Sequence, residues 1–347
     1  MDDDEELDTA PPTRYRRWLG PLAGGLGATL VVVAVVVALT GSDDTTKPRL
    51  DRSQSSSTGR PGDGSIQALA TAPHGRFLAL EASRLSLRTA DGQVLRRSAV
   101  VDTGVAASEL IRIVVDSAAE VAWLVPIATN SAGAASAYSL RDLHRVDQMA
   151  LPAVTGDAAA LDGTLYAATR SGLFALRPGS AAPKPLGGGR PSVVVADPSR
   201  HRVLLITTGS QSFAIRTFAP GIGLGKASAL PAGLSPTLAV VGGSIWASYG
   251  DASTAVLARL DPRTLRPVLT LAADRYGSAA TIVATGDVSL FLRPRESPFR
   301  LWCVDARDGK SVSLGSADGL IAASGGRVLV APLIGPPTQF DRGECPG

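Results

Sequence analysis

The sequence predicts an all-β protein, a β-propeller of seven four-stranded blades, preceded by one transmembrane α-helix. The first observation is a repeat, because short and mostly apolar runs begin at Phe77, Val121, Leu165, Val203, Ile245, Leu290 and Val328. These starts are 44, 44, 38, 42, 45 and 38 residues apart, and repeats of about 40–45 residues made of short strands are typical of propeller blades. The second observation is a high content of turn residues, with 37 Gly and 24 Pro. The third is an uncharged stretch near the N-terminus, from Leu19 to Thr40.

Each repeat contains four predicted strands joined by turns. In one unit the strands are Leu238–Val241, Ile245–Ser248, Leu257–Asp261 and Pro267–Leu271. A single narrow sheet cannot cover its own two faces, whereas several sheets stacked around an axis bury both faces of each. The continuous apolar second strands indicate positions buried on both sides, and the more polar fourth strands indicate the rim.

Two parts of the repeat pattern leave alternatives open. The segment Ser139–Met149 has apolar residues spaced by three, which fits either a helix or a strand, a turn and a further strand. The last unit has room for only one more strand, near Gln339–Asp341, before the chain ends. A seven-bladed ring would then need an outer strand from the N-terminal side, around Leu50–Gln67. Rings of six blades with one degenerate unit, or of eight, are the alternatives.

The N-terminal segment of the chain, residues 1–65, predicts a membrane anchor. We expect residues 1–17 to form a short acidic cytoplasmic tail, residues 18–41 a transmembrane helix, residues 42–65 a flexible Ser/Gly/Pro-rich linker, and residues 66–347 the extracytoplasmic propeller domain. The 22 residues from Leu19 to Thr40 match the ~30 Å hydrocarbon core of a bilayer. Arg14, Arg16 and Arg17 precede the span and place the N-terminus in the cytoplasm, with Trp18 at the interface.

A cleaved signal peptide is the rival interpretation of the same segment. An acidic leading region and the lack of an Ala-x-Ala site after the apolar stretch argue against it. In either case we expect the bulk of the chain to be extracytoplasmic and attached to, or exported across, the cell membrane.

The two cysteines, Cys303 and Cys345, are candidates for a disulfide bond. In an oxidising compartment an isolated pair usually bridges, and a bond that closes this loop stabilises by about 4 kcal/mol in the chain-entropy model. One buried thiol and one terminal thiol are the alternative, and a metal site would need more ligands.

The motifs of common enzymes and cofactor sites do not appear in the sequence. It contains no Gly-x-Ser-x-Gly, Ser-x-x-Lys or His-Glu-x-x-His pattern. The three histidines are His74, His144 and His201, and the first and third occupy the turn before a second strand. We therefore expect no cofactor and no metal. The net charge of +3 is spread without a basic stripe, so nucleic-acid binding is not expected.

The most polar loop between predicted strands carries Arg293, Arg295 and Arg300 together with Glu296. It is a possible recognition loop for an anionic partner. A solvated hairpin is the alternative interpretation.

Gly243-Ser-Ile-Trp-Ala-Ser, followed by Leu260-Asp-Pro-Arg-Thr-Leu-Arg-Pro-Val, resembles the repeats of bacterial YVTN/NHL-type propellers. The Gly-x-Ile-Trp strand is also similar to streptogramin-lyase-like propellers. The resemblance covers most of residues 66–340 and implies a propeller fold. The catalytic histidine and acid of the lyases have no clear counterpart here, so the resemblance carries over no site.

The function expected from the sequence is that of a single-pass membrane-anchored, extracytoplasmic binding or scaffold module. Its partners would be the membrane, through one span, and an unknown envelope protein or glycan. The alternative is a propeller enzyme, a lyase or hydrolase, with its site at the channel mouth. A third hypothesis is a sensor whose short cytoplasmic tail acts as a docking peptide.

Overall fold

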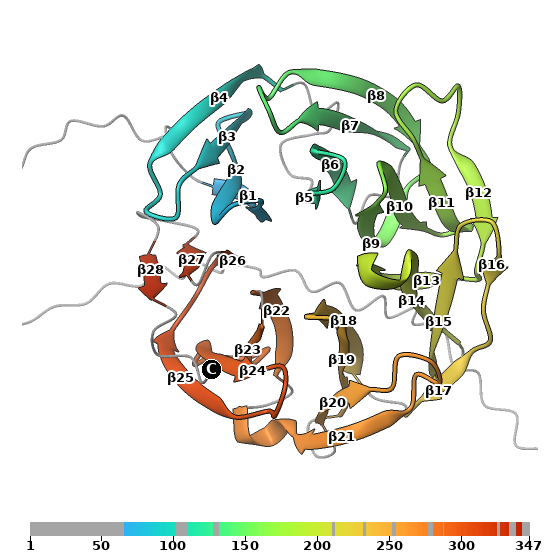
Figure 1. The fold of residues 1–347 in the computed structure, drawn as a ribbon, viewed down its shortest axis with the longest axis vertical. Coiled ribbons are helices and arrows are strands. Elements are labelled where there is room, and N and C mark those ends of the chain that lie inside the picture. Colours follow the sequence, from blue (N-terminus) through green and yellow to red (C-terminus); the bar gives the residue numbers. More distant parts are fainter. Residues whose placement is uncertain are drawn as a thin grey trace, which may run out of the picture. The chain divides into compact units, whose positions relative to one another are not determined.

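The computed structural model describes residues 66–101, 110–127, 132–209, 212–231, 234–251, 255–276, 280–286, 288–324, 327–332 and 338–341. These residues form seven antiparallel sheets around a central axis (Figure 1). We call the sheets blades 1 to 7 in chain order. The predicted tail, transmembrane helix and linker lie outside the described residues. Within the ranges above, no helix is long and apolar enough to cross a membrane.

Blades 1 to 3 each have four strands in chain order. Blade 1 consists of β1 (Ile66–Ala72), β2 (Arg76–Glu81), β3 (Arg84–Arg88) and β4 (Val94–Val100). Blade 2 consists of β5 (Leu110–Asp116), β6 (Val121–Ile127), β7 (Gly133–Ser139) and β8 (Arg145–Leu151). Blade 3 consists of β9 (Val154–Leu161), β10 (Thr164–Thr169), β11 (Gly172–Leu176) and β12 (Lys184–Gly187).

Blade 4 has five strands, since both of its last two pair with the third. They are β13 (Pro191–Asp197), β14 (Arg202–Thr208), β15 (Phe213–Ala219), β16 (Gly223–Leu224) and β17 (Ser228–Leu230). Blade 5 consists of β18 (Leu234–Val241), β19 (Ser244–Gly250), β20 (Val256–Leu260) and β21 (Pro267–Ala272). Two short 3₁₀ turns, η1 (Pro198–Arg200) and η2 (Ala273–Tyr276), lie between strands.

Blade 6 consists of β22 (Thr281–Thr285), β23 (Ser289–Arg293), β24 (Arg300–Asp305) and β25 (Ser311–Ser316). Blade 7 has three strands in the described residues: β26 (Leu320–Ser324), β27 (Arg327–Ala331) and β28 (Thr338–Asp341). The first strand of each blade packs against the first strand of the next, and β26 packs against β1, so the ring is continuous. Figure 1 shows these first strands around the centre and the fourth strands at the rim.

The prediction of an all-β propeller is confirmed. Each of the seven apolar runs found in the sequence is the second strand of a blade. In blade 1 the run Phe77–Leu80 is 0% exposed throughout, because the neighbouring blades cover both of its sides. The predicted polar rim is also found, as β4 and β12 are mostly exposed.

The structure bears on two further expectations of the sequence. Ser139–Met149 is not a helix, because β7 ends at Ser139 and β8 begins at Arg145. The expected outer strand around Leu50–Gln67 lies mostly outside the described residues. Its last two residues, Ile66 and Gln67, belong to β1, which is the innermost strand of blade 1 and not an outer strand.

The turns between the third and fourth strands of blades 2, 5 and 6 share one backbone hydrogen-bond pattern. The N–H groups of Ser139, Asp261 and Asp305 donate to the carbonyl oxygens of His144 (3.0 Å), Arg266 (2.8 Å) and Lys310 (2.8 Å), respectively. The fifth residue of each turn has a positive φ: 59° at Leu143, 57° at Leu265 and 77° at Gly309. The two leucines occupy a strained conformation, which their burial to 1% and 4% exposure offsets.

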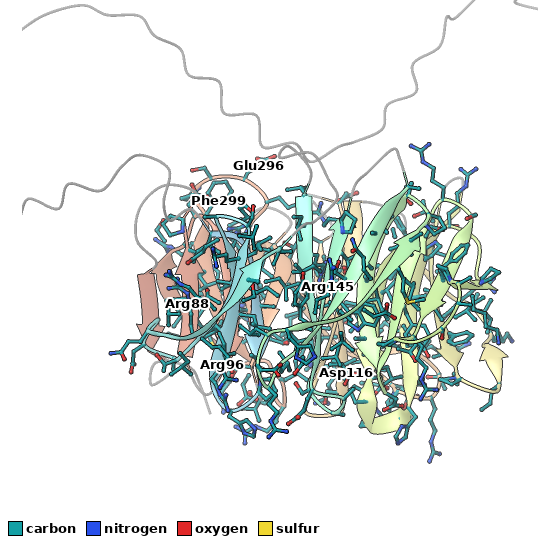
Figure 2. All side chains as sticks on the ribbon, turned by 90° about the horizontal axis from the view of Figure 1, so that it is seen from above. Arg88, Arg96, Asp116, Arg145, Glu296 and Phe299 are labelled. Carbon is teal, nitrogen blue, oxygen red and sulfur yellow. The ribbon has the colours of Figure 1, made fainter. Side chains whose placement is uncertain are left out.

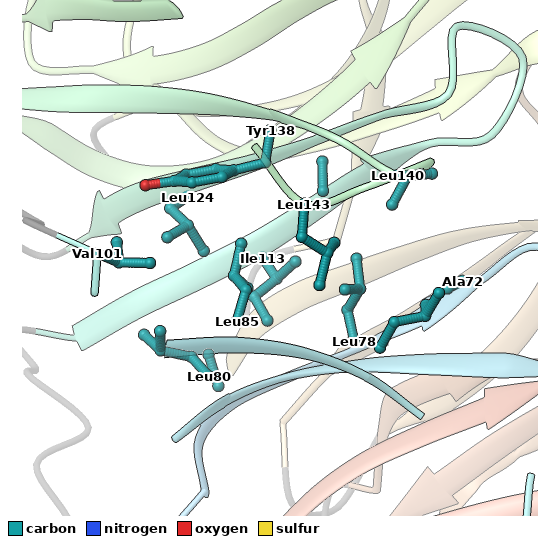
Figure 3. Close-up of a cluster of buried hydrophobic side chains, with 13 residues drawn as sticks. Ala72, Leu78, Leu80, Leu85, Val101, Ile113, Leu124, Tyr138, Leu140 and Leu143 are labelled. Carbon is teal, nitrogen blue, oxygen red and sulfur yellow. The ribbon is translucent and has the colours of Figure 1, made fainter. Parts of the chain in front are cut away.

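The core lies between the blades rather than inside any one of them. Between blades 1 and 2, Leu78, Leu80 and Leu85 pack with residues such as Ile113 and Leu143 (Figure 3). Fully burying one such side chain contributes about 1.5–3 kcal/mol. Each blade therefore depends on its neighbours for most of its apolar burial.

Because consecutive strands are antiparallel, the loops divide between two faces of the ring. We call face A the side with the loops between first and second and between third and fourth strands. Face B carries the loops between second and third strands and the links between blades. In Figure 2, Glu296 and Phe299 lie on the side of the molecule opposite to Arg96 and Asp116.

Candidate recognition surface

The arginine-rich loop predicted from the sequence joins β23 to β24 on face B. Its first arginine, Arg293, donates from Nη1 to the carbonyl oxygens of Gly319 (2.9 Å) and Ala317 (3.3 Å). The guanidinium also stacks over the ring of Phe299, 5.3 Å from its centroid. The N–H of Ala317 donates to the carbonyl of Phe299 at 2.7 Å. The loop is therefore fixed to the link between blades 6 and 7.

The three arginines of this loop have different environments. Burial lowers the pKa of Arg293, and the nearby Asp318 carboxylate partly opposes this. Burial also lowers the pKa of Arg295, whose side chain is half-buried. Arg300 is exposed at the start of β24. The structure thus brings the three residues into one loop but turns Arg293 towards the protein, so that Arg300 and the exposed Glu296 form its outer surface.

An ion pair with a largely buried carboxylate and a half-exposed guanidinium lies between the first strands of blades 2 and 3. Arg112 of β5 pairs with Asp157 of β9, and Asp157 also accepts the N–H of Ala158 at 2.8 Å. Burial raises the pKa of Asp157, while the charge of Arg112 acts in the opposite direction. The sequence analysis missed this pair, and the only signal was a lone carboxylate in the apolar stretch Val154–Leu161.

The raised pKa of Asp157 gives a testable pH dependence. We expect Asp157→Asn to increase the free energy of unfolding at pH 7, because desolvation of the carboxylate outweighs its attraction to Arg112. The side chain of Arg112 is 47% exposed, so its charge stays hydrated when the partner is removed. The pKa of such a carboxyl is higher in the folded protein than in the unfolded chain. The destabilisation caused by its buried charge therefore disappears as pH falls, because the folded protein binds the proton at a higher pH than the unfolded chain does. The difference between variant and wild type in urea unfolding should therefore vanish near about pH 4. Destabilisation by Asp157→Asn at pH 7 would contradict the assignment.

The histidines lie in turns of face A. His201 Nδ1 lies 3.2 Å from Asp162 Oδ2 of the neighbouring blade, and His144 Nδ1 lies 2.5 Å from Asp142 Oδ1. The His144 hydrogen bond is the main cause that lowers the pKa of Asp142 to about 2. His74 is exposed in blade 1. Within the described ranges, no group of three or more His, Cys, Asp and Glu side chains is placed to hold a metal ion.

A second polar cluster on face A joins blade 4 to blade 5. Asp197, 0% exposed, accepts from Ser199 Oγ at 2.7 Å and from Arg202 Nε at 2.9 Å. Arg202 Nη2 also donates a hydrogen bond to the carbonyl of Pro262 at 2.7 Å. Arg200 Nη1 donates to the carbonyl of Gly243 at 3.0 Å. Sequence reasoning also missed this cluster, whose signal is an Asp at the end of an apolar strand followed closely by two Arg residues.

The remaining predicted site residues divide between buried and undescribed positions. Cys303 is buried in β24 within the core between blades 6 and 7, while Cys345 lies outside the described residues. The disulfide between them therefore stays a prediction. The membrane-flanking Arg14, Arg16, Arg17 and Trp18 also lie outside the described residues.

No protein-family model and no curated protein matches the chain. Among solved structures, the Mitotic Checkpoint Complex contains a similar chain, with a TM-score of 0.58, 13% identity, and coverage of 89% of this chain and 99% of that one. The Cps50 (Swd1) β-propeller domain of Myceliophteria thermophila has a TM-score of 0.59 at 10% identity, covering 82% and 97%. PorZ, a surface component of the type-IX secretion system of Porphyromonas gingivalis, has a TM-score of 0.51 at 12% identity, covering 80% and 38%. At such low identity these matches show the β-propeller fold alone.

Proposed function

We propose that the protein is a single-pass membrane-anchored, extracytoplasmic β-propeller that binds a cell-envelope partner, a protein or a glycan, and catalyses no reaction. Its N-terminus would be cytoplasmic and residues 18–41 would span the membrane. The proposal includes a ring of seven blades of the four-stranded type, in which β16 and β17 together take the place of the fourth strand of blade 4. It also includes kinship with YVTN/NHL-type repeats. A propeller at a bacterial surface has a parallel in PorZ, which is described as an essential bacterial surface component.

The observation that carries the proposal is the architecture of the loop between β23 and β24. Arg293 donates hydrogen bonds to the carbonyl oxygens of Gly319 and Ala317, and these bonds fix the backbone of the loop. Arg300 and Glu296 are left at the surface of face B. A rigid loop that presents a charged side chain binds at lower entropic cost than a mobile one, and Arg is enriched among the residues that dominate interfaces.

The experiment is capture of partners from detergent-solubilised membranes of the source cells by the full-length protein. We expect Arg300→Ala to reduce recovery of the bound partner by about tenfold or more, the range for an interface anchor. Arg266→Ala is the matched control, because Arg266 is exposed on face A and should leave recovery unchanged. An equal loss in both variants, or no specific partner at all, counts against the proposal.

The enzyme alternative draws on one observation, the raised pKa of Asp157, since perturbed carboxyls cluster at functional sites. A lyase or hydrolase site would need further acid or base groups beside it. The three histidines lie in turns of face A, whereas Asp157 lies inside β9 and pairs with Arg112. This arrangement favours the binding module.

A further inference from the structure

Nearly all of the net positive charge of the propeller lies in blades 3 and 4, and it is not spread over the ring as expected from the sequence. From Val154 to Leu230 the chain has eight basic and three acidic residues, a net charge of +5. The rest of residues 66–347 has 19 basic and 18 acidic residues, a net charge of +1. Two blades therefore account for most of the attraction of the propeller for anions.

The three carboxylates of these two blades already have partners within the protein. Asp157 pairs with Arg112 of blade 2, and Asp162 Oδ2 lies 3.2 Å from His201 Nδ1. Asp197 is buried and pairs with the two arginines of the face A cluster described above. The cations of blades 3 and 4 that form no ion pair within the described part of the chain are Arg177, Lys184, Arg190, Arg216 and Lys226.

Two of these cations project into the outer part of the space between blades 3 and 4. Lys184 of β12 is paired with Ala175, which packs in the core between the two blades. Arg216 of β15 is paired with Leu205 of the same core. Directly paired residues of antiparallel strands project on the same side of the sheet. Lys184 and Arg216 therefore approach the same rim from opposite sides.

The divided outer strand of blade 4 adds a third cation and an aliphatic side chain to this rim. β16 pairs with the face A end of β15 and β17 with its other end, so residues 225–227 form a break that carries the exposed Lys226. Leu224 of β16 is 37% exposed. It reaches blade 3, because a Cβ added at Gly188 would lie 3.6 Å from Leu224 Cδ2. Figure 1 shows β12 and β16 side by side at the rim.

Ile222 is the most exposed of the large apolar residues that the structure describes, at 88%. It stands in the turn between β15 and β16, where its N–H donates to the carbonyl of Ala219 at 3.1 Å. Gly221 and Gly223 flank it with φ angles of 79° and 94°, and a Cβ at either would meet nothing within 4 Å. The turn therefore holds an aliphatic side chain in water, and a partner can cover its apolar surface favourably.

We propose that this surface docks on an anionic lipid bilayer. We call it the docking rim, and it consists of Lys184, Arg216, Ile222, Leu224 and Lys226. Its cations face lipid phosphates, and Ile222 enters the boundary between headgroups and acyl chains. Cations beside exposed aliphatic side chains are the combination that binds anionic bilayers, whereas a purely anionic polymer offers nothing to Ile222. The proposal rests on the membrane anchor of the proposed function, which brings the ring to the bilayer.

Docking on this rim also determines where the proposed recognition loop lies. Figure 1 shows β12 and β16 across the ring from β25 and β28. A ring that rests on blades 3 and 4 therefore holds blade 6 away from the lipid. The loop that carries Arg300 is then accessible to a partner in the cell envelope.

The test is backbone hydrogen exchange of the full-length protein in nanodiscs of two compositions, phosphatidylcholine alone and phosphatidylcholine with phosphatidylglycerol in equal parts. We expect the amides of residues 221–227 to exchange about tenfold more slowly in the anionic nanodiscs, because lipid contact excludes water from the turn. The corresponding turn of blade 5, residues 263–266, is the internal reference and should exchange equally in both. Equal exchange of residues 221–227 in the two lipids overturns the proposal.

Charge reversal at the rim should abolish the slower exchange. In Lys184→Glu/Lys226→Glu two attractive charges become repulsive, and each cation near an anionic surface raises membrane partitioning about fivefold. Arg263→Glu/Arg266→Glu is the matched control, because both arginines are exposed in the turn of blade 5, and it should keep the slower exchange. An equal loss in the two double variants would reflect net charge alone and contradict the docking rim. Full protection in Ile222→Ser would contradict it as well.

Other outcomes separate the docking rim from the proposed function. If polyglutamate added to phosphatidylcholine nanodiscs slows the exchange of residues 221–227 equally, the rim binds an acidic polymer and the lipid proposal fails. If the protein does not enter nanodiscs, the anchor of the proposed function fails, and the same exchange measured with vesicles of the two compositions tests the rim by itself. Arg300→Ala belongs to blade 6 and should leave exchange at the rim unchanged, so a failure of partner capture gives a different result.

Discussion

Gly319→Ala is expected to destabilise the propeller by at least about 3 kcal/mol, the range for a backbone clash in a strained conformation. Gly319 lies in the link between blades 6 and 7 with a φ of 142°, a region open essentially to glycine alone. A Cβ there would lie 2.2 Å from the carbonyl oxygen of Ala331 and 2.8 Å from Cα of Pro332. Both are backbone atoms, so a side-chain rotation cannot relieve the overlap. Urea unfolding followed by tryptophan fluorescence measures the effect.

Gly221→Ala is the control that separates the steric clash of an added Cβ at Gly319 from the cost of a positive φ. Gly221 has a φ of 79°, and a Cβ there would meet nothing within 4 Å. We expect this variant to lose only about 1 kcal/mol, the cost of a left-handed conformation for a residue with a Cβ. If the two variants were equally stable, the close approach of Gly319 to β27 would not exist in solution. Gly319→Ala should also weaken partner capture, because the carbonyl of Gly319 holds Arg293.

The repeat architecture could be predicted from the sequence because burial imposes a local pattern. A second strand covered on both sides needs an unbroken apolar run such as Phe77–Leu80, and such a run is visible without knowledge of its neighbours. The turn Asp261-Pro-Arg-Thr could also be predicted from the sequence, because its Asp side chain accepts hydrogen bonds from the nearby N–H groups of Thr264 (2.7 Å) and Arg263 (3.0 Å). Both features depend only on residues close in the chain.

Contacts between blades could not be predicted in this way. Three arginines near residue 295 are visible in the sequence, but the one that turns inward is selected by the carbonyl of Gly319, 26 residues away. The pair of Arg112 and Asp157 likewise depends on how two first strands are staggered. Such contacts are set by the rigid placement of one sheet beside the next, which no local pattern encodes. The sequence therefore indicates the loop as a candidate site, but not which of its arginines is anchored to the neighbouring link and which is exposed.

Asp197→Asn is expected to destabilise the propeller by about 3–5 kcal/mol, the cost of removing one partner of a buried ion pair. Asp197 is fully buried, and the side chain of its partner Arg202 is only 13% exposed. The variant keeps the size of the side chain but leaves the Arg202 charge without its counter-ion. Only neutral acceptors, among them the carbonyl of Pro262, then face this charge, so the link between blades 4 and 5 weakens. Asp308→Asn is the control, because Asp308 pairs with the exposed Lys310 and should leave the unfolding midpoint almost unchanged.

The double variant Asp197→Asn/Arg202→Met distinguishes a buried charge from a simple loss of hydrogen bonds. If the single variant is unstable because Arg202 is left uncompensated, removing that charge should recover part of the loss, since replacing both partners of a buried pair costs far less than breaking it. The sum of the two single effects would then exceed the effect of the double variant. Strictly additive losses in urea unfolding would show instead that Asp197 acts through Ser199 and the local turn, and that the two arginines are not held by its charge.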